Sequence, residues 1–170
     1  MISREKALRH LLACYDAVYS SLGRGAPKIT NDGVVVRLYE MGRAFGALAL
    51  PIREELTITG SVPLPVLLDV LDEALAVDPT GALGVYAMSS VVGPRLLVTL
   101  RDIREHCAPD SSLTGHLDQG AQVSVREVRS LATRELDGFV TDDPHWQSAA
   151  RGLVETLEKS GNAESFTFSR

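Results

Sequence analysis

Ser89, Ser90, Gly93 and Arg95 are the residues whose types and spacing could bind a ligand, and they surround Pro94 in the stretch MSSVVGPRLLVTLRD. Proline suits the first turn of a helix, where backbone N–H groups have no partner within the helix. A helix that begins at Pro94 would point these amides, two hydroxyls and a guanidinium at a small anion. The stretch lacks the glycine pattern of a phosphate loop, so a plain capped helix start is the alternative.

Metal-binding chemistry would have to come from two pairs of residues. His10 and Cys14 are four apart and would be neighbours on a helix, whereas His106 and Cys107 are adjacent in sequence. Adjacent residues rarely both ligate one ion, and both cysteines border apolar stripes. We therefore predict buried free thiols and no metal site.

The sequence motifs of common enzymes are missing. The nearest approach to a GxSxG turn is AMSSV, with Ala87 and Val91 where glycines belong, and neither GxGxxG nor a Walker sequence occurs. The four histidines are scattered singly, and His116 and His145 lie in predicted loops, where a catalytic role is easier to accommodate. No nucleotide or other cofactor is predicted.

The charge distribution disfavours nucleic acid as a partner. Seventeen basic and 22 acidic residues give a net charge of -5, and no Lys or Arg lies between Arg53 and Arg95. The first residues, MISREK, are charged, and no uninterrupted apolar run approaches the roughly 18 residues of a membrane helix. We expect a cytoplasmic protein that binds no membrane.

These residues must be positioned by elements that the apolar periodicity and the turn residues predict. We expect three helices in the first two thirds of the chain, from Ser3 to Leu22, from Leu64 to Val77 and from Pro94 to Cys107. A fourth helix follows the capping box formed by Ser124 and Glu127. A fifth runs from Pro144 to Gly161 and is capped by Asp143. We expect strands at Leu56–Ser61, Leu83–Val92 and Ser165–Ser169, a turn at Asp78–Gly81, and a polar loop or flap at Ala108–Gln122.

The segment from Val34 to Leu50 fits two structures. Its three consecutive valines favour a strand from Val34 to Tyr39, then a tight connection at Met41–Gly46 and a second strand from Ala47. A helix is the alternative, because Val34, Leu38, Met41, Phe45 and Leu48 recur at helical spacing. The GxxxG of Gly42 and Gly46 indicates either turn chemistry or close packing. We favour the strand.

Together these elements predict one α+β domain over residues 1–170, with a small sheet from the segments near Val34, Leu56, Val85 and Phe166 and about four main helices packed on it; a mainly α fold is the alternative. We expect a non-enzymatic regulatory or interaction module that binds a protein partner or a small ligand. A homodimer is expected, because a terminal strand can pair across a subunit boundary. The alternative function is a small enzyme acting on an anionic metabolite near Pro94.

Overall fold

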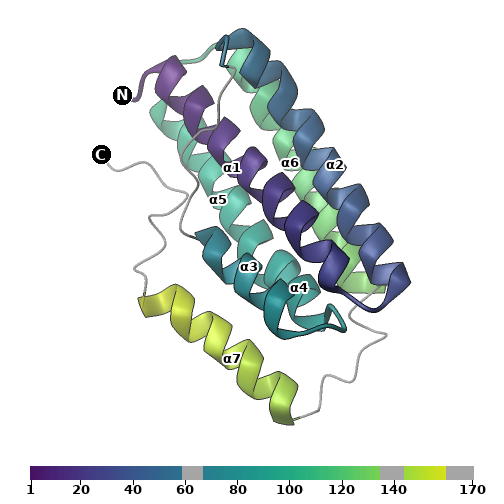
Figure 1. Cartoon of the computed structure of the whole chain (residues 1–170). Helices are drawn as coiled ribbons and strands as arrows, with labels where there is room; N and C mark the ends of the chain where they lie inside the picture. Colours follow the sequence, from purple (N-terminus) through teal and green to yellow (C-terminus); the bar gives the residue numbers. More distant parts are fainter. Residues whose placement is uncertain (59–66, 135–143, 160–170) are drawn as a thin grey trace.

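Four long helical stretches lie side by side in the structure, a computed structural model that describes residues 1–58, 67–134 and 144–159 (Figure 1). They are α1 (Arg4–Gly25), α2 (Asp32–Glu55), the continuous stretch formed by α4 (Ala82–Tyr86), a π-helical segment (Ala87–Val92) and α5 (Gly93–His106), and α6 (Ser111–Arg134). The shorter helices α3 (Leu67–Val77) and α7 (Pro144–Lys159) cover one end of the bundle. Helix α1 packs on α2 and α3, α6 packs on α5 and α2, and α7 contacts α3 and α4.

The predicted sheet is wrong for the residues that the structure describes. Val34 and Val85 lie inside helices, and Leu56 follows the end of α2. The β-type contact seen in the described part is an isolated parallel bridge between Ile2 and Cys107. The chain is therefore mainly α, the alternative that we had not favoured. The strand predicted at Ser165–Ser169, on which the homodimer rests, lies outside the described residues.

Burial decides the ambiguous segment in favour of a helix. Asn31 accepts a hydrogen bond from the Val34 N–H at 3.2 Å and so caps α2 at its start. Val34, Leu38, Met41, Phe45 and Leu48 are all buried, as expected for one face of a helix that packs on a core. The predicted strand, tight connection and second strand are thus wrong. A run of β-branched residues does not prevent a helix whose apolar spacing meets a packed core.

The stretch from Ala82 to His106 is helical throughout, which overturns both the strand at Leu83–Val92 and the helix start at Pro94. The Gly93 N–H donates to the carbonyl oxygen of Met88, five residues earlier, in the π-helical segment. Pro94 has no N–H and its ring crowds the carbonyl four residues before it, so a widened turn lets the helix continue past proline. An uncharged run indicates that a segment is buried, but a covered strand and a core helix are both buried, so the run does not distinguish between them.

The polar loop predicted at Ala108–Gln122 is wrong as well, because α6 begins at Ser111. Asp110 caps this helix by accepting from the Leu113 N–H at 2.8 Å. Leu113, Leu117 and Gly120 are buried, so only a narrow face of the first turns meets the core. Ser124, predicted to cap a helix, is instead buried in the middle of α6.

Other predicted features are confirmed. Ser3 caps α1 by accepting from the Lys6 N–H, although the helix extends to Gly25 rather than to Leu22. Helix α3 ends at Val77, the following turn contains Gly81 with a positive φ of 85°, and α7 begins at Pro144. The predicted start of α3 at Leu64 and the cap Asp143 lie outside the described residues.

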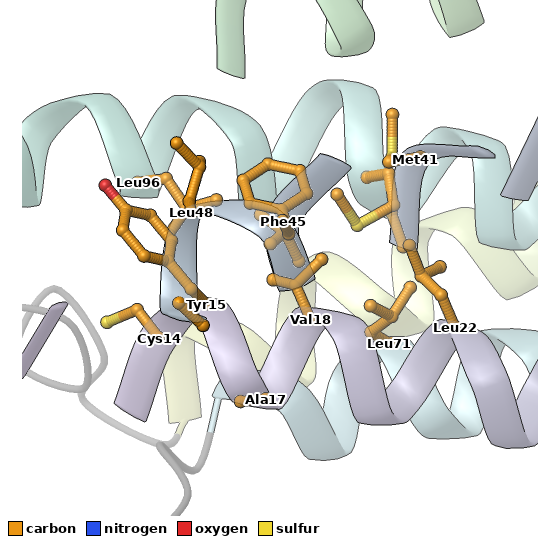
Figure 2. Packing of buried hydrophobic residues seen from close by; sticks show 14 of the residues in the cluster. Cys14, Tyr15, Ala17, Val18, Leu22, Met41, Phe45, Leu48, Leu71 and Leu96 are labelled. Carbon is orange, nitrogen blue, oxygen red and sulfur yellow. The ribbon is translucent and has the colours of Figure 1, made fainter. Parts of the chain in front are cut away.

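The core is aliphatic with few aromatic rings, as Figure 2 shows for the centre of the bundle. Tyr15 of α1 and Phe45 of α2 lie with ring centroids 6.1 Å apart, and both belong to the same buried cluster as Leu71 of α3 and Leu96 of α5. The helix Ala82–His106 is long and apolar enough to cross a membrane by length and composition alone, when an 18-residue window of it is considered. However, 61% of that window is buried inside the bundle, and a buried core helix passes the same test.

Candidate functional site

The four residues of the predicted anion site lie at the π-helical segment, but no helix begins there. Gly93 is buried with helical φ and ψ, Ser90 is exposed, and Ser89 and Arg95 are half-buried. The Ser89 hydroxyl donates to the carbonyl of Tyr86 at 3.4 Å and lies 3.4 Å from the Ser90 hydroxyl. Helical hydrogen bonding continues through this segment, so anion binding here remains a prediction without the free amides that motivated it.

The buried-thiol interpretation agrees with the structure. Cys14 and Cys107 are both buried free cysteines, and burial raises the pKa of each thiol above its usual range. Within the described ranges, no group of three or more histidine, cysteine and acidic side chains is arranged to hold a metal ion.

A polar network joins three helices at the end of the bundle far from α7 (Figure 1). Arg4, at the start of α1, forms ion pairs with Glu55, at the end of α2, and with Asp110, at 3.1 Å. Ser112 of α6 donates to both carboxylate oxygens of Glu55 at 3.1 Å, and His116 Nε2 lies 2.9 Å from one of them. Sequence reasoning missed this network, because Ser112 and His116 were placed in a loop.

The ion pairs and hydrogen bonds of this network connect α1, α2 and α6 to one another. Ser112 and His116 both contact the Glu55 carboxylate, so Glu55 links the end of α2 to the first turns of α6. Burial and the nearby Arg4 guanidinium lower the pKa of His116, and Asp110 opposes the shift. Because Arg4 also pairs with the Glu55 carboxylate, that carboxylate favours the imidazolium less than an unpaired one would.

A groove of about 370 Å³ lies on another face of the molecule, between α1 and α2. Two tyrosines and two arginines supply its larger side chains: Tyr19 and Arg24 from α1, and Tyr39 and Arg43 from α2. Close packing of the two helices shapes it, because a Cβ atom at Gly46 would lie 3.0 Å from Cδ2 of Tyr19. The Gly42–Gly46 pair thus serves close packing, one of the two roles expected from the sequence.

The two arginines of the groove differ in their charge partners. Nη2 of Arg24 donates to both carboxylate oxygens of Asp72 of α3, at 3.2 and 2.9 Å. Arg43 is exposed and forms no ion pair within the described part of the chain. In the groove, the positive charge of Arg24 is therefore balanced by the Asp72 carboxylate, whereas the charge of Arg43 is not balanced by any described carboxylate.

An apolar stripe continues the groove along the outer surface of α2. It consists of Val36, Tyr39 and Leu50, which are 55%, 42% and 56% exposed, with Arg43 between them. Spacings of three, four and seven residues place these side chains on one side of a helix. Tyr19 of α1, 50% exposed, borders the same groove. The stripe extends about 21 Å along the helix axis at ~1.5 Å per residue.

Comparison of the chain with family profiles, with curated protein sequences and with solved structures finds no match. The site is therefore defined by its own geometry, and the α1–α2 face, made of the groove and the α2 stripe, is the strongest candidate.

Proposed function

We propose that this protein is a non-enzymatic interaction module that binds a protein partner on the α1–α2 face. The observation that carries the proposal is the row of exposed Val36, Tyr39 and Leu50 beside the groove. Single exposed apolar residues are ordinary, but an aligned set beside a concave surface is typical of binding sites. Tyrosine and arginine, the larger residues of the groove, are also enriched at the centres of protein interfaces.

Site-specific photo-crosslinking in the native cell tests this proposal. A benzophenone amino acid is introduced at Tyr39, and in a control at Val125 of α6, which has nearly the same exposure, 42% against 40%. We expect a discrete adduct with one protein from position 39 and none from position 125. Equal labelling from the two positions, or no adduct from position 39, would show that the α1–α2 face is not the binding surface.

A further inference from the structure

The charge at the centre of the α2 stripe identifies the kind of partner that fits. Arg43 lies halfway between Val36 and Leu50, seven residues from each. It is exposed, the neighbouring carboxylate of Glu40 pairs with Arg37 at 3.1 Å, and Arg43 itself forms no ion pair among the described residues, in a chain whose net charge is -5. An interface that covers Val36 and Leu50 together must also cover Arg43, and a desolvated guanidinium is costly unless an acceptor pairs with it.

The form of the stripe favours a helical occupant. The exposed side chains repeat along one side of α2, and the groove runs beside them between two helices. An amphipathic helix binds such a surface with apolar anchors spaced three and four residues apart, whereas an extended strand needs an exposed sheet edge, which the described residues lack.

A second copy of the same chain fits this face poorly. If two α2 helices pack antiparallel around a two-fold axis at the middle of the stripe, each Arg43 faces Arg43 of the other copy. Packing parallel around a two-fold axis also brings each residue next to its own equivalent. Both symmetric arrangements place two guanidinium groups together, and like charges in an interface are destabilising.

From this combination of apolar anchors, helical form and central positive charge, we infer that the α1–α2 face receives an amphipathic helix of another protein, with an Asp or Glu opposite Arg43. This inference rests on the proposed interaction function and specifies the partner. The anchors of the bound helix would lie against Val36, Tyr39 and Leu50, and its carboxylate would pair with Arg43. A guanidinium and a carboxylate can form two parallel hydrogen bonds, so the pair would also fix the register of the two helices.

The probe for the inference is a phage-displayed library of helical peptides with apolar residues at spacings of three and four and a randomised central position. Selection on the full-length protein should enrich Asp or Glu at that position, and selection on Arg43→Glu should enrich Lys or Arg instead. For an enriched acidic peptide, Arg43→Gln should raise the Kd about tenfold, equivalent to ~1.4 kcal/mol. Val125→Asp is the control for an exposed substitution elsewhere, and should leave the Kd unchanged.

Three results would overturn the inference. One is enrichment of peptides without preference for charge at the central position, and another is no enrichment on the native protein. The third is concentration-dependent dimerisation in sedimentation velocity that Leu50→Asp abolishes, since a second copy would then occupy the stripe. If the peptides show no charge preference while crosslinking from position 39 still gives one adduct, the interaction function stands and only the acidic class of partner fails.

Discussion

Replacing Gly120 with alanine should destabilise the protein, although alanine is the better helix former. Gly120 is buried in α6, and an added Cβ atom would collide with the hydroxyl oxygen of Tyr15. It would also lie 3.1 Å from Cζ of the same ring and 3.3 Å from Cδ2 of Leu100. Overpacking of this kind costs about 1–3 kcal/mol, and the helix propensity of alanine returns about 1 kcal/mol. We expect a net loss of up to about 2 kcal/mol.

Three further variants test the physical reason for this expectation. Gly115 lies in the same helix, and a Cβ atom there meets nothing within 4 Å, so Gly115→Ala should stabilise by up to about 1 kcal/mol. Tyr15→Phe removes a buried hydroxyl that has no hydrogen-bond partner among the described residues, and should be nearly neutral. In the double variant Tyr15→Phe, Gly120→Ala the contact with the hydroxyl oxygen is removed, so the double variant should be more stable than Gly120→Ala alone.

Urea unfolding followed by the helical circular dichroism signal measures the free energies of unfolding of the native protein and of the four variants, and an unchanged m-value shows that only stability has changed. The double-mutant cycle should give a coupling of about 1–3 kcal/mol between positions 15 and 120, the cost of the overpacking alone. Additive effects, or equal effects of alanine at 115 and 120, would mean that Tyr15 and Gly120 do not pack as described.

Two further predictions concern pH and the core. The pKa of His116 is lowered in the folded state, so the stability that its neutral form contributes is complete above the unfolded pKa of 6.5 and is lost as the pH falls below that value. When unfolding is measured from pH 7.5 to 5, the free energy of unfolding of His116→Gln should therefore change less with pH than that of the native protein. An equal change in the two proteins would mean that His116 is not the source of the pH dependence. Phe45→Ala should lower the free energy of unfolding by about 3–5 kcal/mol because Phe45 is fully buried. Val36→Ala, on the exposed side of α2, should change the free energy of unfolding by no more than about 0.5 kcal/mol. Comparable losses at both positions would contradict this assignment of the buried and exposed faces of α2.

The sequence predicted helices well where apolar spacing and an end signal agreed, as at Ser3 and Pro144. The prediction failed where the sequence showed that a segment is buried but did not show whether a sheet or other helices cover it. The uncharged run from Pro79 to Pro94 lies mostly in a helix surrounded by other helices, and periodicity cannot separate such a segment from a covered strand. The start of α6 looked like a loop because the glycine at position 120 accommodates Tyr15, a residue more than a hundred positions away.

The candidate sites were harder to predict than the helices. The anion site depended on a helix start at Pro94, and the π-helical segment removed that premise. The α2 stripe was hidden by the strand assignment, because Val36, Tyr39 and Leu50 align only at helical spacing. The contacts of the network around Glu55 join residues that lie 51 to 108 positions apart in the sequence, and no local pattern indicates such contacts.

The network at the end of the bundle also sets an order of events during synthesis. Helices α1 and α2, which form the proposed binding face, are both complete once residue 55 has been made. The contact between Glu55 and His116, however, can form only after His116 has been synthesised, 61 positions later in the chain. At about 5–20 residues per second, that interval lasts roughly 3–12 s. The proposed binding face therefore leaves the ribosome several seconds before the contacts between Glu55 and α6 can form, and a partner present at that time would meet α1 and α2 first.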